Sequence, residues 1–380
     1  METPAIAIIG GGPCGLTLAR LLECQGIDYI VYERDESSTS NRAGGTLDIH
    51  AGTGQYALRE CGLFDAFQKH ARYEDVFFAL ADKHGKRVFE IGQGHDAPEI
   101  DRRELRQILL DSIPPGKIKW GHSLRGVEFG DDKELILEFA NGTRLSGFEL
   151  IVGTDGAWSK VRPAVTAAYP QYSGKSYLES RIRLDSPLYE KTKRAMEHGT
   201  FVTVGSGKLS VTQRQGDGSY RNYFGFQVPE DFFSNDNVDV SDVEATRQLL
   251  LTKFYADWSE DHKELVQHAT DFRPWPLYTL STEDMGWKSV GGITLAGDAA
   301  HLAITNGEGV NLALTDAVKL ASSIAEHGLD NLSQAIQSYE EELSIRGTDT
   351  INKGKALAEV MFSDGPQALI DLMNSFVEEA

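Results

Sequence analysis

The sequence predicts an α/β protein whose two α/β segments, one at each end, enclose a β-rich middle. Three observations support this prediction. A buried strand, a glycine-rich turn and an amphipathic helix follow one another at the N-terminus. A second buried strand runs into a Gly-Asp turn at Gly297 and then into helix. Between them, residues 170–280 are rich in aromatic residues and alternating segments typical of an antiparallel sheet. The first domain is therefore expected to be discontinuous in sequence.

The N-terminal unit is complete within about thirty residues. Residues 5–9 are a continuous apolar run, as expected for a strand buried on both faces of a parallel sheet. The turn 10–15 follows, and then a helix that ends near Gly26. A second strand, 29–32, leads to Glu33.

The remaining elements follow from the same patterns. A hairpin is predicted over 76–91, and strands over 134–140 and 144–152 are joined by a turn at Asn141-Gly142. A buried strand is predicted at 292–296. Helices are predicted at 103–110, about 243–258, 310–325, 332–362 and 366–378.

Composition excludes several classes of function. The 380 residues are 41% hydrophobic, which is enough for a sizeable core, and 37 basic against 57 acidic residues leave a net charge of −20. Nucleic-acid and polybasic membrane-surface binding need a cationic face, so neither is expected. Cys14, Cys24 and Cys61 form no CxxC pair, which argues against a disulfide framework or a metal site. With no bilayer-length apolar run and no leader pattern, we expect a soluble, cytoplasmic monomer.

The strongest motif is the N-terminal glycine turn. Gly10, Gly12 and Gly15 form GxGxxG, in which the first glycine allows the turn, the second lets a pyrophosphate approach and the third lets helix and strand pack closely. Glu33 ends the second strand, where a carboxylate accepts hydrogen bonds from ribose hydroxyls. The pattern predicts a Rossmann-like dinucleotide site without separating FAD from NAD(P).

Two further turns carry weaker signals. Asp298 follows a buried strand and is placed to hold a polyhydroxyl chain. Gly307 and Gly309 precede a helix whose start, near Asn311, would stabilise an anion such as reduced flavin. The alternative interpretation of this second motif is an ordinary strand–turn–helix in which the Asp is only the N-cap of the helix. Residues 153–162 form the third motif, with an acidic turn before a short helix as its alternative.

Three motifs together resemble the single-component (class A) FAD-dependent aromatic hydroxylases in their order and separations. They are GxGxxG at residues 10–15, DGxxSxVR at 155–162 and GDAAH at 297–301. Further segments resemble the tetracycline-degrading flavin monooxygenases: 32–34, 44–50, 98–102, 105–106 and 339–341. The resemblance implies a GR2-type fold, with a Rossmann-like FAD-binding domain, an antiparallel-sheet substrate domain and a C-terminal helix. It assigns 1–75, 98–169 and 281–335 to the first domain, 76–97 and 170–280 to the second, and 336–380 to a helical segment.

The resemblance also implies site residues. Glu33 would hold the adenosine ribose, Leu124 would offer a backbone contact near the adenine, and Asp298 would hold the ribityl chain. Asn41 and Arg42 occupy the segment that receives NADPH in the family. No metal is implied, and the FAD is expected to be non-covalent. The positions assigned to FAD are Gly10, Gly12, Gly15, Glu33, Arg34, Asp48, Arg102, Leu124, Asp298, Gly307, Gly309 and Asn311.

Two departures from the family concern the substrate. The segment 302–306 is one residue shorter than in the family and lacks its proline and aromatic, which leaves Ile304 as the bulkiest side chain and predicts a wider, wetter space beside the flavin. The family's drug-binding Gln and His correspond to Glu179 and Tyr223, which argues against tetracycline as the natural substrate.

The function implied by the resemblance is an NAD(P)H- and O2-dependent monooxygenase that hydroxylates an aromatic or polyketide-like small molecule through a flavin C4a-hydroperoxide. A flavin halogenase is the weaker alternative, because residues 273–277 do not match the WxWxIP signature. A cyclase or isomerase that retains FAD, and a flavin-bound sensor, stay open. His301 is expected to have a backbone or packing role, and His262 to be solvent-exposed on a charged helix.

Overall fold

A computed structural model describes residues 4–40, 44–74, 77–91, 96–131, 134–196, 199–234, 238–304 and 307–378. The chain forms two compact units, each assembled from three stretches of sequence. The first unit comprises residues 1–71, 102–171 and 279–353, and the second comprises residues 72–101, 172–278 and 354–380. The long helix over residues 332–361 begins in the first unit and ends in the second.

A parallel sheet of five strands forms the core of the first unit, in the order β17-β11-β1-β2-β7. These strands are β1 (Ile6–Ile9), β2 (Tyr29–Tyr32), β7 (Ile118–Lys119), β11 (Leu150–Gly153) and β17 (Ile293–Leu295). β1, β2, β11 and β17 are buried along their whole length, which explains their largely apolar sequences.

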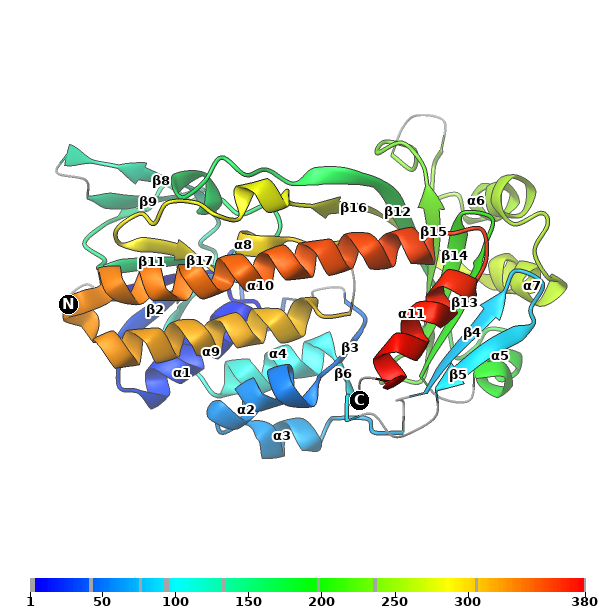
Figure 1. Cartoon of the computed structure of the whole chain (residues 1–380), viewed down its shortest axis with the longest axis horizontal. Helices are drawn as coiled ribbons and strands as arrows, with labels where there is room; N and C mark the ends of the chain where they lie inside the picture. The colour runs from blue at the N-terminus through cyan, green and yellow to red at the C-terminus, as the bar shows by residue number, and fades with distance from the viewer. Residues whose placement is uncertain are drawn as a thin grey trace. The chain divides into compact units, whose positions relative to one another are not determined.

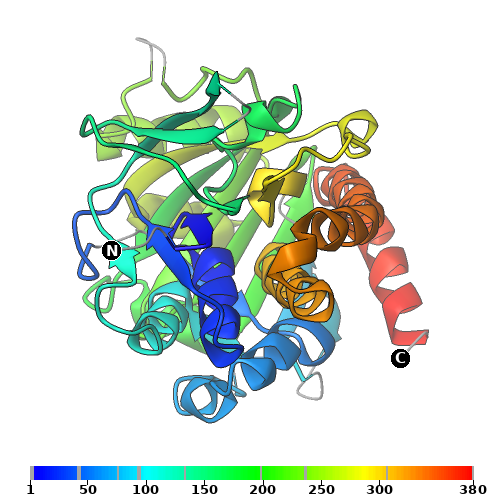
Figure 2. The same cartoon turned by 90° about the vertical axis from the view of Figure 1, so that its left-hand side faces the viewer.

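Helices cover one face of this sheet, with α1 packed against α9, and a small antiparallel sheet lies on the other side (Figures 1 and 2). Rings of Tyr32 and Phe139, 5.0 Å apart, join the two sheets. The α-helices of this unit are α1 (Pro13–Cys24), α2 (Tyr56–Glu60), α3 (Phe64–Gln68), α4 (Arg102–Asp111), α8 (Asp298–His301), α9 (Gly309–His327) and most of α10 (Leu332–Met361). Shorter elements are β3 (Thr46–Asp48), the π-helix η1 (Ala51–Gln55), and the 3-10 turns η3 (Arg162–Ala164), η5 (Thr282–Asp284) and η6 (Leu329–Asn331).

The predicted strand 144–152 is wrong as a single element. The chain forms β10 (Arg144–Leu145), which pairs with β9 (Leu135–Phe139) and, through it, with β8 (Leu124–Phe129), and then leaves for β11 in the parallel sheet. Gly147 lies between the two strands at φ +86°, a left-handed conformation that interrupts extended backbone.

A seven-stranded mixed sheet dominates the second unit, in the order β16-β12-β15-β14-β13-β4-β5. β15 pairs antiparallel with β12 and β14, β14 with β13, and β4 with β5, whereas β13 and β4 are parallel. Its strands are β4 (Phe78–Asp82), β5 (Arg87–Ile91), β12 (Gln171–Ile182), β13 (Thr200–Gly205), β14 (Lys208–Arg214), β15 (Tyr220–Gln227) and β16 (Thr270–Thr279), and β6 (Glu99–Asp101) is a separate short strand.

Apolar clusters cover the two faces of this sheet. One cluster joins Phe224 and Phe226 to α6 (Val243–Leu249), the π-helix η4 (Leu250–Phe254) and α7 (Glu260–His268). The opposite face packs against the end of α10 and α11 (Gln367–Glu378). A further helix, α5 (Tyr189–Met196), contributes to a third cluster. No helix among the described residues is both long and apolar enough to cross a bilayer.

Candidate functional site

The glycine turn joins β1 to α1, and its three glycines have different surroundings. Gly10 has φ +113°, and a Cβ there would lie 2.6 Å from the carbonyl oxygen of Thr154. A Cβ on Gly15 would lie 2.1 Å from the carbonyl oxygen of Gly10, so only glycine lets α1 pack this closely. Gly12 precedes the helix, and a Cβ there would meet nothing within 4 Å. The turn therefore has open space at Gly12, at a helix start that favours phosphate oxygens.

Glu33 lies beside this turn. Its carboxylate is 1% exposed and accepts hydrogen bonds from the backbone N–H groups of Gly11, at 2.5 Å, and Asp35, at 2.9 Å. Arg106 fixes the same region, donating to the carbonyl of Gly11 and to the carboxylate of Asp35. The acid is thus held next to the turn, while Arg34, which follows it, is exposed.

Asp298 begins α8, directly after β17 and the tight turn at Gly297, whose φ is +61°. Its side chain is exposed and makes no hydrogen bond or ion pair within the described part of the chain. A carboxylate with free acceptor oxygens at this position fits the polyhydroxyl chain of a flavin cofactor.

Arg162 connects two of the predicted motifs. Its buried guanidinium donates to the carbonyl oxygens of Asp298, at 2.8 Å, Ala299, at 2.7 Å, and Ala157, at 2.9 Å. Asp155 organises the turn before it, accepting hydrogen bonds from Ser159 Oγ and the N–H of Lys160. Burial raises the pKa of Asp155, although these hydrogen bonds oppose the shift. Residues 153–162 therefore brace the segment that presents Asp298.

A cluster of largely buried ionised side chains on α8, α9 and α10 supports the segment that contains Asp298. Asp316, on α9, is completely buried, pairs with His301 Nε2 at 2.5 Å and with Arg346 at 3.2 Å, and accepts the N–H of Gly297 at 2.9 Å. Burial alone would lower the pKa of His301, but the Asp316 carboxylate outweighs it and raises that pKa. The sequence did not reveal this buried ion pair of His301, because its partner lies further along the chain on α9.

The long helix α10 fastens β17 through its side chains. Tyr339 donates from its hydroxyl to the carbonyl of Leu295 at 3.0 Å. Glu340 accepts hydrogen bonds from Thr294, at 2.7 Å, and Ser289. Tyr339 and Glu340 belong to the segment 339–341, which resembles the tetracycline-degrading flavin monooxygenases. They anchor the strand that leads to Asp298.

A second cluster joins β3 to the start of α9. Both ring nitrogens of His50 face carboxylates, with Nε2 2.9 Å from Asp48 and Nδ1 3.2 Å from Glu308. Asn311 is buried, accepts the N–H of His50 and donates to the carbonyl of Asp48, each at 2.9 Å. Because both nitrogens must donate, His50 is an imidazolium. It ties Asp48 to the loop of Gly307 that begins the helix.

This geometry predicts a pH dependence. Hydrogen bonds donated to Asp48 and Glu308 raise the pKa of His50 from 6.5 to about 10. The stabilisation from His50 is therefore complete below pH 6.5 and is lost as the pH rises through about 10. Urea unfolding between pH 6 and pH 10 should show the free energy of unfolding falling with pH. His50→Gln should flatten that slope, whereas the control His84→Gln, at an exposed turn residue, should leave it unchanged. Equal slopes in all three proteins would contradict this assignment.

The remaining predicted cofactor positions also lie in the first unit. Arg102 is exposed at the start of α4, and its side chain lies against Gly44, where a Cβ would come within 2.6 Å of Arg102 Cδ. Leu124 begins β8 and is buried. Asn41 and Arg42, the expected NAD(P)H positions, lie outside the described residues.

The predicted substrate positions Glu179 and Tyr223 are direct neighbours on β12 and β15 of the second unit. Glu179 is buried and pairs with Arg221 at 2.7 Å, and its other oxygen accepts the indole N–H of Trp275 at 2.9 Å. The ring of Tyr223 lies 5.9 Å from that of Tyr177, between centroids. Arg221 was missed from the sequence, although its position two residues before Tyr223 on a strand places it on the same face.

Two other expectations concern single residues. Ile304 is buried, and the neighbouring positions 305 and 306 lie outside the described residues. The expected exposure of His262 is wrong, because its ring is buried against Phe224, Tyr255 and Trp258. Burial lowers the pKa of His262 to about 3, so the ring is neutral.

The arrangement of the first unit fits a flavin dinucleotide. It offers open backbone at Gly12, an acceptor carboxylate at Glu33, a free carboxylate at Asp298 and a helix start behind Gly307. Every position assigned to FAD from the sequence belongs to this unit. A phosphate, a ribose and a polyhydroxyl chain each match one of these donor or acceptor sets.

Comparisons with known proteins agree with this fit. The family model of the FAD binding domain matches residues 2–354. Monooxygenase penA of Penicillium thymicola is 31% identical, over 88% of this chain and 90% of its own length. The structure of Klebsiella pneumoniae HpxO complexed with FAD and uric acid has a TM-score of 0.78 at 20% identity, covering 98% of this chain and 92% of that one. Tetracycline destructase Tet(55) has a TM-score of 0.77 at 21% identity, covering 99% and 95%. At these identities the two structures demonstrate a shared fold.

Proposed function

This chain belongs to the FAD binding domain family and is an FAD-dependent monooxygenase, and from that premise we propose that it uses NAD(P)H and O2 to hydroxylate an aromatic or polyketide-like small molecule. The resemblance to class A hydroxylases is confirmed. The observation that carries the proposal is the free carboxylate of Asp298, whose backbone carbonyl accepts a hydrogen bond from Arg162 at the start of α8, in the same unit as the glycine turn.

Bound FAD would accept a hydride from NAD(P)H and activate O2 for transfer of one oxygen atom. The chain's own contribution is binding and orientation. The N–H groups after Gly12 would hold the pyrophosphate, and Glu33 would accept the ribose hydroxyls. Asp298 would hold the ribityl chain, and the start of α9 would stabilise negative charge on the reduced ring.

The second unit supports an aromatic substrate. One face of its sheet carries the rings of Tyr177 and Tyr223, and the indole of Trp275 is bonded to a buried carboxylate, Glu179, on the same face. Such a surface offers stacking together with a few fixed polar groups, as small-molecule sites do. Uric acid, which is bound in the HpxO structure, is a planar heteroaromatic molecule and therefore belongs to the class of substrate that we propose.

Asp298→Ala should weaken FAD binding about tenfold or more. The reason is that a charge-assisted hydrogen bond contributes about 1.5–3 kcal/mol, and no second carboxylate begins α8. The measurement is quenching of flavin fluorescence as FAD is titrated into the apoprotein. Asp330→Ala, at an exposed acidic residue of η6 in the same unit, should bind FAD like the wild type. Unchanged affinity in Asp298→Ala would remove Asp298 from the site.

The test of function is oxygen transfer. The purified protein should be yellow, and it should oxidise NADH or NADPH faster when a phenolic or polyketide-like substrate is present. With ¹⁸O2, one labelled oxygen atom should appear in the product. Turnover under strict anaerobiosis without NAD(P)H would refute the monooxygenase and favour a cyclase or isomerase. Ligand binding without any turnover would favour a sensor.

A further inference from the structure

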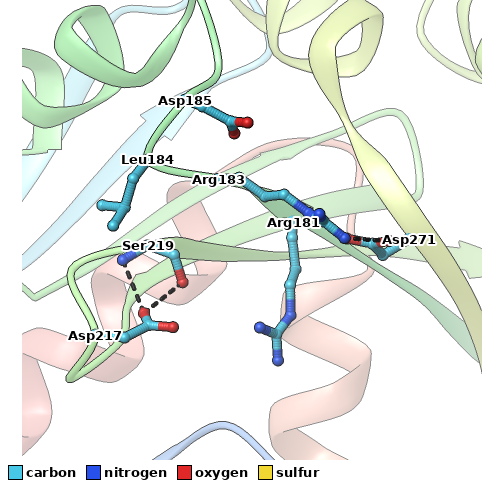
Figure 3. Close-up of a pocket in the computed structure, with 7 residues that line it drawn as sticks. All are labelled: Arg181, Arg183, Leu184, Asp185, Asp217, Ser219 and Asp271. Carbon is cyan, nitrogen blue, oxygen red and sulfur yellow. Dashed lines mark hydrogen bonds and ion pairs between the residues drawn. The ribbon is translucent and has the colours of Figure 1, made fainter.

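A pocket of about 560 Å³ opens on the second unit, outside the positions discussed so far. It lies where β12 leaves the sheet, beside the turn between β14 and β15 and the start of β16 (Figure 3). Its charged and polar lining includes Arg181, Arg183, Asp217, Ser219 and Asp271. This volume is within the range of small-molecule sites.

Part of the charge in the pocket is already satisfied. Arg183 and Asp271 form a two-pronged ion pair, with Nε and Nη2 of the arginine 3.0 and 2.8 Å from one carboxylate oxygen. Asp217 uses its Oδ1 atom to accept the N–H and the hydroxyl of Ser219, at 2.9 and 2.6 Å. These pairs shape the walls and need no ligand.

Besides the exposed carboxylate of Asp185, two groups remain available. The guanidinium of Arg181 has no hydrogen bond or ion pair within the described part of the chain, and neither has Oδ2 of Asp217. Figure 3 shows the Arg181 side chain turned away from Arg183, with the unbonded oxygen of Asp217 on the side toward Arg181. Partial burial would raise the pKa of Asp217, but Ser219 and the charge of Arg181 bring it below its ordinary value. The pocket thus holds a cation and a carboxylate that do not bond each other.

The chemistry of a matching ligand follows from this pair. A simple anion would suit Arg181 but would face Asp217 and the exposed Asp185, and a simple cation would face Arg181. A planar edge that carries a carbonyl oxygen beside an N–H satisfies both groups, because arginine only donates and the carboxylate only accepts. Leu184, which is 57% exposed, adds apolar surface for the attached ring.

We propose that this pocket binds an amide or lactam edge of the substrate, with its carbonyl oxygen accepting from Arg181 and its N–H donating to Asp217. The inference rests on the proposed function in taking the ligand to be the substrate. The binding itself needs neither NAD(P)H nor O2, so it can be measured separately.

Three probes of the same shape test the proposal: benzamide, benzoate and benzamidinium. Binding to the FAD-loaded protein is followed by ligand-observed NMR without NAD(P)H. Benzamide should bind best. Arg181→Gln and Asp217→Asn should each weaken benzamide binding about tenfold. They should also change the ranking in opposite directions, since Arg181→Gln removes the repulsion of benzamidinium and Asp217→Asn removes that of benzoate. A merely structural effect would not produce opposite preferences.

Arg194→Gln, on the exposed face of α5, is the matched control and should bind all three probes like the wild type. The proposal is overturned if benzamide does not bind, if benzoate or benzamidinium binds better, or if neither pocket variant alters the ranking. Benzamide binding of the expected kind in a protein that transfers no oxygen would refute the proposed function and leave the pocket assignment standing. Oxygen transfer with no benzamide binding would refute the pocket assignment and leave the proposed function standing.

Discussion

Gly15→Ala should both destabilise the fold and abolish tight FAD binding. The new Cβ would lie 2.1 Å from the carbonyl oxygen of Gly10 and 2.5 Å from Thr154 Oγ1, so α1 must move away from β1. Overpacking of this kind costs about 1–3 kcal/mol of unfolding free energy. The helix start would also lose its alignment with the pyrophosphate. Two charge-assisted hydrogen bonds, at about 1.5–3 kcal/mol each, correspond to about a hundredfold loss of affinity or more.

Gly12→Ala is the matched comparison, because its Cβ would meet no protein atom within 4 Å and its φ of −83° suits any residue. The apoprotein should therefore be as stable as the wild type, or more stable by about 0.4–1 kcal/mol. The methyl group would nevertheless occupy the open space assigned to the pyrophosphate, so FAD affinity should fall. Urea unfolding of the apoproteins and flavin titration separate the two effects. Wild-type FAD affinity in Gly12→Ala would place the phosphates elsewhere.

Asp316→Ala should be the most destabilising substitution in the ion cluster, costing about 3–5 kcal/mol. The loss leaves Arg346 and the buried His301 without their shared carboxylate, and it removes the acceptor of the Gly297 N–H. FAD affinity should fall as well, because Gly297 forms the turn that presents Asp298. The measurements are the midpoint of urea unfolding and flavin titration.

A matched cycle of Asp316→Leu, His301→Leu and the double variant provides the control for this prediction. Removing both ends of a buried pair leaves less uncompensated charge than removing one, so the double variant should recover part of the lost stability. Additive losses in the two single variants would mean that the pair contributes no coupling.

The sequence alone was sufficient for the glycine-turn unit and the helices that follow β17. β1, β2 and α9 lie within one or two residues of their predicted bounds, and α1 begins three residues earlier than expected, at Pro13. Each of these elements has a local cause, since an apolar run, a glycine or a helical periodicity acts over a few neighbouring residues. The family and its cofactor were also recognisable, because the motif residues keep their order and separations along the chain.

The partners of the buried polar groups follow from the tertiary fold and not from the local sequence. His262 has charged neighbours in sequence but is buried against the ring of Phe224 on β15 and the rings of Tyr255 and Trp258 in the segment before α7. His301 meets a carboxylate on α9, and Glu179 meets Arg221 on the next strand. The strand predicted over 144–152 divides between two sheets for the same reason. These outcomes depend on tertiary contacts, in which the attraction between polar groups competes with the cost of burying them. A local sequence pattern does not show the result of that competition.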